Sequence, residues 1–237
     1  MTEFALVPIA FMASTLAAVF GMGGGVLLIT LMPGLVPAAA IIPLHAVTQL
    51  ASNGSRALFG WRHIDTRLIL PFLLGAALGA AVGALVFEQL NLDWLPGLIG
   101  IVILVITWMP LPMVRGAGRW PLVLLGFYQT AIGMVIGASG PLGAALLARR
   151  SKRRDWLVVN TAVYMSGNHT LRILAFFVLG FSFADYALLL AGMVLGVVAG
   201  SWLGTWLRQY VPELNFHLWF KVLVSLLALR MIALVVI

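Results

Sequence analysis

Four glycines stand within five positions in the stretch Phe20-Gly21-Met22-Gly23-Gly24-Gly25-Val26, inside an apolar run from Phe4 to Thr30. In an isolated helix each glycine costs about 0.8–1.0 kcal/mol relative to alanine. In hydrocarbon, a helix break also leaves peptide N–H and C=O groups unpaired, unless protein covers the break or the break lines a cavity. We therefore interpret Gly21–Gly25 as an interruption in a membrane segment that faces something polar. The alternative is close packing of two helices through small residues.

The composition of the 237-residue chain is that of an integral membrane protein. The chain is 62% hydrophobic and 9% charged, whereas soluble domains are usually about 25% charged. Apolar stretches of about 20 residues recur along its whole length. They do not alternate polar and apolar residues, as the strands of an outer-membrane barrel would. The sequence thus predicts an all-α, multi-pass protein of the bacterial inner membrane.

Composition also disfavours several classes of function. The absence of cysteine excludes a disulfide framework, a thiol nucleophile and a thiolate metal site. The net charge of +7 comes from basic residues in short loops between apolar runs, which is a topology signal and not a nucleic-acid-binding surface. The four histidines lack metal-ligand spacing, and no spanning segment has a carboxylate near its centre. We therefore expect no metal, no cofactor and no enzyme activity.

Four kinds of segment follow one another in the same order twice along the chain. They are an apolar segment broken by glycines, a segment with a polar middle, a segment with glycines at every fourth position, and a plain apolar segment. In chain order the segments are Phe4–Leu31, Val36–Phe59, Leu68–Phe87 and Trp94–Val114, followed by Pro121–Leu147, Trp156–Leu179, Phe183–Leu207 and Leu214–Ile237. A single shift of 116 residues lays Gly21 on Gly137, and the same shift lays Arg56 on Arg172. Such repeats dictate architecture. We predict one transmembrane domain made of two repeated halves, residues 1–119 and 120–237.

Loop charges indicate that the two halves are inverted. If every apolar stretch crossed the membrane, the ten loop Lys and Arg residues would divide six to four between the two faces. If each broken segment is instead a re-entrant hairpin, each half has three spanning helices and all ten fall on one face. The acidic residues Glu3, Glu88, Asp93 and Asp185 then fall on the other. The positive-inside rule favours this arrangement, and eight full spans remain the alternative.

An inverted repeat would bring the two glycine breaks together near the membrane midplane. A helix that begins after a glycine turn offers free N–H groups and its positive dipole end, and two such ends form a site for an anion. The polar segments add side chains that donate hydrogen bonds to an oxyanion. The candidate substrate-binding residues are Gly23, Gly24, Gly25, Thr48, Gln49, Ser52, Asn53, Arg56, Ser139, Gly140, Tyr164, Asn168, His169 and Arg172.

These candidates also have structural alternatives. The polar side chains could form a seam between helices, where each contact contributes about 0.6 kcal/mol. Arg56 and Arg172 lie off-centre in their segments and could extend to the membrane surface. His169 could be a hydrogen-bonded structural residue and not the carrier of a coupling proton.

The motifs resemble those of a known family. The glycine stretch is followed by a polar helix that ends near Arg56, a basic loop with Ile64-Asp65, a span with Pro71 and glycines at every fourth position, and a second copy, Gly137-Ala138-Ser139-Gly140-Pro141. Over essentially its whole length the chain is similar to the TauE/SafE family of membrane transporters, often called sulfite exporters. The resemblance implies transport of sulfur-containing anions such as sulfite or organosulfonates, whereas the residues by themselves require only a small anion.

We therefore expect a secondary transporter in the lipid bilayer that moves a small, sulfur-containing anion by alternating access, with or without a coupling proton or ion. One alternative is an anion channel built on the same site. The other is a membrane subunit that transports nothing and scaffolds an assembly.

Overall fold

The computed structural model describes residues 2–21, 23–109, 118–137, 139, 143, 146–147, 150–151, 153–211 and 216–236. The α-helices in these residues are α1 (Leu6–Phe20), α2 (Gly24–Leu31), α3 (Ala38–Phe59), α4 (Ile69–Glu88), α5 (Leu95–Trp108), α6 (Trp120–Ile136), α8 (Arg154–Val178), α9 (Ala187–Leu207) and α10 (Phe216–Val236). Short 3-10 helices cover Thr2–Ala5, Trp61–His63, Thr66–Leu68, Leu92–Trp94 and Ala184–Tyr186. The predicted all-α fold class is confirmed.

Four described segments are long and apolar enough to cross a bilayer: Thr2–Phe20, Thr66–Glu88, Ala184–Leu207 and Leu218–Val236. Shorter apolar helices cover Leu92–Trp108 and Trp120–Ile136. With 22 and 25 residues, α3 and α8 are long enough to cross, since a helix rises about 1.5 Å per residue. Their middles are polar, however, and lipid cannot satisfy polar groups. These two helices must therefore bury their polar faces against protein.

The chain folds back at the first glycine stretch. Gly21 and Gly23 have φ angles of +82° and +96°, a region that L side chains rarely adopt. Gly21 ends α1 by donating its N–H to the Ala17 carbonyl oxygen at 2.9 Å. Gly24, at the start of α2, packs so closely on α1 that an added Cβ would collide with the Ala13 carbonyl oxygen. A continuous helix would hold residues 13 and 24 far apart, so α2 returns alongside α1.

A similar return follows α6. Gly137 has a φ of +79° and donates its N–H to the Gly133 carbonyl oxygen at 2.9 Å. The Gln129 amide donates to the Ser139 carbonyl oxygen at 2.7 Å, which holds residue 139 beside α6. These two returns support the hypothesis of re-entrant hairpins.

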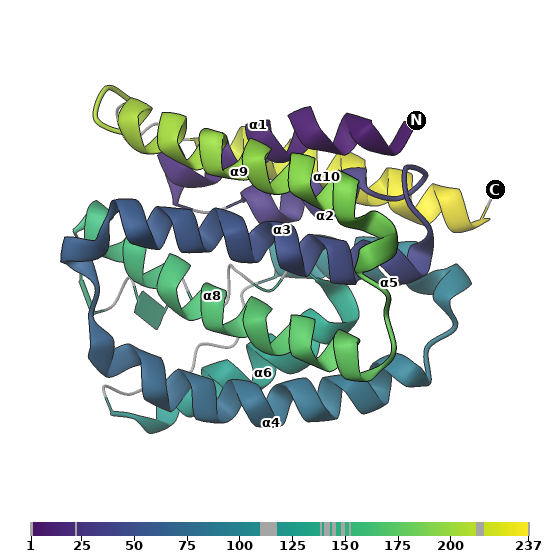
Figure 1. Cartoon of the computed structure of the whole chain (residues 1–237), viewed down its shortest axis with the longest axis horizontal. Coiled ribbons are helices and arrows are strands. Elements are labelled where there is room, and N and C mark those ends of the chain that lie inside the picture. The colour runs from purple at the N-terminus through teal and green to yellow at the C-terminus, as the bar shows by residue number, and fades with distance from the viewer. Residues whose placement is uncertain are drawn as a thin grey trace.

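The main helix pairs of the two halves correspond to each other. Exchanging the halves would turn the α1–α9 pair into the α6–α4 pair. Helix α1 packs along α9 and α6 along α4, α3 lies between α8 and α9, and α5 packs on α10 (Figure 1). The glycine stripes bring the first two pairs close together. A Cβ on Gly79 would collide with the Phe127 carbonyl oxygen of α6, and a Cβ on Gly200 with the Phe11 carbonyl oxygen of α1. This reciprocity supports the inverted repeat, which remains a prediction.

The two chain ends lie at the same end of the helical bundle (Figure 1). Basic loops gather at the opposite end. Arg154 donates to the carbonyl oxygens of Val19 and Val211, and Asn160 donates to the His63 carbonyl oxygen at 2.8 Å. These contacts join the end of α1, the start of α8, the end of α9 and the loop after α3. We call this the basic end, and its position is the one that the positive-inside argument requires.

Candidate functional site

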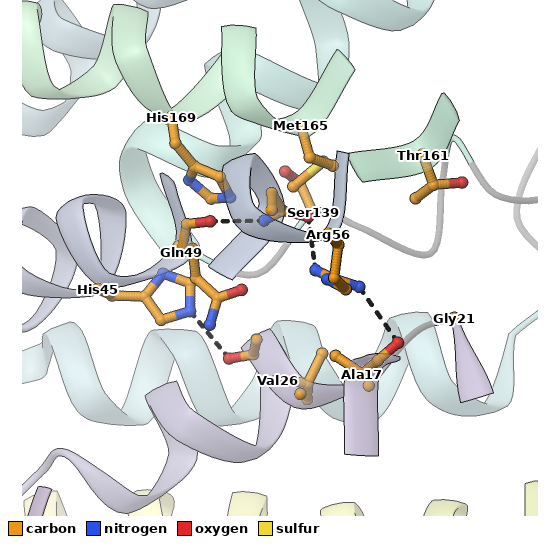
Figure 2. A pocket seen from close by; sticks show the side chains of 15 residues that line it. Ala17, Gly21, Val26, His45, Gln49, Arg56, Ser139, Thr161, Met165 and His169 are labelled. Atoms are coloured by element: carbon orange, nitrogen blue, oxygen red, sulfur yellow. Dashed lines mark hydrogen bonds between the residues drawn. The ribbon is translucent and has the colours of Figure 1, made fainter. Parts of the chain in front are cut away.

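A small cavity of about 50 Å³ lies where the two fold-backs meet the polar helices. Figure 2 shows the lining residues of α8 on one side, those of α1 and α2 on the other, and His45, Gln49 and Arg56 of α3 between them. The lining residues are Ala17, Gly21, Gly23, Gly24, Gly25, Val26, His45, Gln49, Asn53, Arg56, Gly137, Ser139, Thr161, Met165 and His169. Eight of the predicted site residues are among them: Gly23, Gly24, Gly25, Gln49, Asn53, Arg56, Ser139 and His169.

Helical spacing explains how α3 and α8 contribute to the cavity. On α3 the lining side chains lie four, four and three residues apart, which places them on one face; they are His45, Gln49, Asn53 and Arg56. On α8 the lining residues Thr161, Met165 and His169 also follow every fourth position. Each helix thus turns one face toward the cavity, polar on α3 and mixed on α8, where Met165 is apolar.

The shift of 116 residues relates the lining of one half to that of the other. The related pairs are Gly21 with Gly137, Gly23 with Ser139, His45 with Thr161, Gln49 with Met165, and Asn53 with His169. Our sequence analysis did not include His45, Thr161 or Met165 among the candidates. Applying the same shift to the four-residue spacing of α3 would have found them.

His45 fixes the start of α2 against α3. Its Nε2 donates to the Gly25 carbonyl oxygen at 2.9 Å, since a carbonyl can only accept. A Cβ on Gly25 would lie 3.2 Å from the Gln49 amide oxygen, so a side chain here would require Gln49 to shift by a few tenths of an ångström. The His45 and His169 rings, from opposite halves, have centroids 6.0 Å apart.

Arg56 and Arg172 are both buried, with 5% and 0% of their surface exposed. Neither reaches an exposed surface, as the snorkelling alternative requires. Arg56 donates to the carbonyl oxygens of Ser52 and Ala17, both at 3.2 Å, and to Asn53 Oδ1 at 2.6 Å.

Arg172 lies behind the cavity lining and repeats this arrangement. It donates to the Gly137 carbonyl oxygen at 3.0 Å and contacts His169 Nδ1 at 3.2 Å. Each arginine therefore holds a fold-back and the side chain three residues before it.

Among the described residues, no carboxylate balances these two charges. Six of the seven acidic residues are described, and none of these six lines the cavity: Glu3, Asp65, Glu88, Asp93, Asp155 and Asp185. Within the described residues the one ion pair joins Arg208 to Asp155 at 2.9 Å, at the basic end. Buried charges are strongly unfavourable without a partner, so this site favours an anion.

Unpaired polar atoms accompany the two charges. Among the described residues, the buried polar atoms without a hydrogen-bond partner in or beside the cavity are His45 Nδ1, Ser139 Oγ, His169 Nε2, Arg172 Nε and Arg172 Nη2. Leaving such a group unpaired costs about 1–3 kcal/mol, and more for a charged group. Ser139, His169 and Arg172, all from the second half, thus offer donors that an oxyanion would satisfy.

Four of the predicted residues are buried elsewhere: Thr48, Ser52, Tyr164 and Asn168. Each precedes a lining residue by one position, and one position turns a side chain by about 100° around the helix. Ser52 instead shares a hydrogen bond with Ser14 of α1 at 2.8 Å, and Asn168 donates to Thr130 of α6 at 2.8 Å. For Ser52 and Asn168 these contacts fit the polar-seam alternative. The remaining candidate, Gly140, lies outside the described residues.

Comparison with models of known families identifies the family. The model described as sulfite exporter TauE/SafE matches residues 6–231. The chain belongs to the TauE/SafE family. The resemblance seen in the glycine motif is thereby confirmed, and the chain is a multi-pass membrane transporter of a family that is not enzymatic. Comparisons with curated proteins and with solved structures found no match.

The cavity of this TauE/SafE protein extends toward the basic end. Its outer residues, Gly21 and Thr161, lie opposite the His45 and His169 pair (Figure 2), and Thr161 adjoins Asn160, which contacts the basic loop. In the other direction, Ile29 of α2 lies against Gly137, and Ile41 and Ile42, which precede His45 on α3, are completely buried. The described residues on that side are therefore apolar.

Proposed function

We propose that the protein is a secondary transporter of the bacterial inner membrane that moves a small, sulfur-containing oxyanion of about the size of sulfite by alternating access around this cavity. The observation that carries the proposal is the pair of buried guanidinium groups, Arg56 and Arg172, one from each half and neither with a carboxylate partner among the described residues. The family description, which names sulfite exporters, supports the sulfur-containing class.

The size of the cavity supports a small ligand. A cavity needs about 10–15 Å³ to hold one water molecule. This cavity of about 50 Å³ therefore holds a ligand of roughly four heavy atoms. Sulfite has four heavy atoms, whereas an organosulfonate adds a carbon chain. The described conformation therefore favours sulfite over the larger candidates.

The donors suit an oxyanion. The Gly23 carbonyl oxygen accepts from Leu27 N–H at 2.9 Å as the first bond of α2, so the N–H groups of Gly24 and Gly25 have no partner within the helix. The positive end of the helix dipole adds to this attraction. Ser139 and His169 contribute side-chain donors from the other half.

The two hairpins support alternating access. The cavity extends toward the basic end, and we infer that the buried Ile29, Ile41 and Ile42 block it toward the chain termini. Under the inverted repeat, exchanging the conformations of the two halves would block the basic end and open the other. Transporters built from inverted repeats alternate in this way around a fixed site.

The test is sulfite counterflow into liposomes that contain the purified full chain. We expect saturable uptake that trans sulfite accelerates. Arg56→Gln should abolish it, and Arg62→Gln, in the exposed loop, should not. Flux that does not saturate and does not respond to trans sulfite would indicate a channel. The absence of flux for every anion tested would favour the scaffold alternative.

A further inference from the structure

A second hollow lies on the outside of the protein, at the basic end, between the starts of α4 and α6. Its volume is about 790 Å³, and no described residue lines both this hollow and the transport cavity. The residues that line it are Thr66, Arg67, Leu70, Pro71, Leu74, Gly118, Arg119, Trp120, Leu122, Val123 and Arg150. We call it the α4–α6 groove.

Three exposed arginines give this groove its charge: Arg67, Arg119 and Arg150. They come from three separate segments, before α4, before α6 and before α8. Arg150 Nη2 donates to the Gly118 carbonyl oxygen at 3.1 Å, which holds two of these segments together. The nearby carboxylate of Asp65 accepts the backbone N–H of Arg67 at 3.1 Å and does not line the groove. The groove therefore attracts anions.

Below the arginines the groove is apolar, and its apolar wall continues along α4. Exposed side chains follow at roughly every fourth position of that helix: Leu70, Leu74, Leu78, Val82 and Leu85. Trp120, at the level of the arginines, is 76% exposed, and exposed tryptophan is typical of the membrane–water interface. The charged part thus lies at headgroup level, and the apolar stripe leads from it toward the bilayer interior.

We propose that the α4–α6 groove binds one anionic phospholipid of the phosphatidylglycerol class. The phosphate contacts the arginines, and an acyl chain lies along the α4 stripe. Basic pockets between transmembrane helices bind anionic headgroups in this way. A second copy of the chain is a poorer occupant, since two such arginine clusters would repel each other.

The experiment compares lipid binding to the full chain in detergent by native mass spectrometry. The probes are phosphatidylglycerol and phosphatidylcholine with identical acyl chains. We expect the wild type to bind phosphatidylglycerol at least tenfold more tightly. In the Arg67→Gln/Arg119→Gln variant this preference should fall by about 10–30-fold, because each basic residue near an anionic lipid contributes about a fivefold factor.

The matched control is Arg62→Gln/Arg153→Gln, which removes two exposed arginines of the same end that lie outside the groove. The control should keep the wild-type preference. Equal losses in both variants would show general charge attraction and overturn the proposal. Glycerol 1-phosphate displacing the lipid at equal concentration would also overturn it, since the site would then bind a soluble anion. A dimer that dissociates in the groove variant would assign the groove to a second copy.

Discussion

Arg172 contacts His169 Nδ1 at 3.2 Å, and this contact fixes the tautomer of the imidazole. A guanidinium can only donate, so Nδ1 is the acceptor and the proton of the neutral ring is on Nε2. His169 Nε2 is buried without a partner among the described residues, and it belongs to a residue that lines the cavity. The arginine thus turns a histidine into a directed donor for an anion.

Substitution of His169 by asparagine should separate the two roles of this side chain: accepting from Arg172 at Nδ1 and donating from Nε2. Asn53 accepts from Arg56 at 2.6 Å in the corresponding place, so His169→Asn should keep the arginine in position but lose the Nε2 donor. We expect normal thermal stability and a rise in the KM for sulfite of about 10–100-fold, because a hydrogen bond to a charged group contributes about 1.5–3 kcal/mol. His169→Leu should lose both stability and counterflow, and unchanged flux in that variant would contradict the assignment.

Removal of Arg56 should affect the protein differently with and without ligand. The buried charge is itself unfavourable, but Arg56 also donates to the Ala17 carbonyl oxygen and to Asn53 Oδ1, so Arg56→Gln should lower the melting temperature of the ligand-free protein and still leave it folded. The increase in melting temperature that sulfite gives the wild type should disappear, because stabilisation by a ligand scales with its affinity. A sulfite-induced increase that survives in this variant would place the anion elsewhere. Arg62→Gln is the matched control.

Gly24 and Gly54 offer a matched pair of alanine substitutions. A Cβ at position 24 would collide with the Ala13 carbonyl oxygen, whereas one at position 54 meets nothing within 4 Å. We expect Gly24→Ala to destabilise the protein by about 1–3 kcal/mol or more through overpacking. Gly54→Ala should be neutral or stabilising by up to about 1 kcal/mol, because alanine favours the helix. Thermal unfolding of the two variants in detergent measures the difference, and equal stabilities would argue against the tight hairpin.

The topology can be tested directly because the natural chain has no cysteine. Single substitutions Arg67→Cys and Arg153→Cys should react with an impermeant maleimide from one face of the membrane. Glu88→Cys and Asp185→Cys should react from the other. Labelling of positions 67 and 153 from opposite faces would instead support eight full spans.

The sequence could predict two kinds of feature: the fold-backs, which depend on glycine, and the membrane face of the loops, which depends on charge. The backbone at each fold-back has a positive φ that side chains disfavour, so Gly21 and Gly137 predict both turns from the sequence. The positive-inside rule predicts that the loop arginines lie on one membrane face, and this topology stays a prediction. The shift that relates the lining residues was likewise visible in the sequence.

The sequence could not show which of two adjacent polar residues on a helix faces the cavity. Thr48 and Gln49 are both polar and adjacent, and only the positions of α1 and α9 decide which of the two faces the cavity. The burial of Arg56 and Arg172 was also undetermined, because an off-centre arginine can reach the surface or turn inward with equal ease. The hydrogen bond of His45 could not be foreseen, because its partner is the backbone oxygen of Gly25; only the spacing of four residues from Gln49 indicated that His45 lines the cavity.

The crossed packing of α1 on α9 and of α6 on α4 has a consequence for biosynthesis. When the ribosome has completed the first half, α1 and α4 are in the bilayer with their closest partners not yet made. Neither half buries all of its helix faces by itself. The second half supplies α9 as the partner of α1 and α6 as the partner of α4. A chain cut between residues 109 and 118 would therefore behave as an obligate heterodimer, in which two separately translated halves become stable only when they find each other in the membrane.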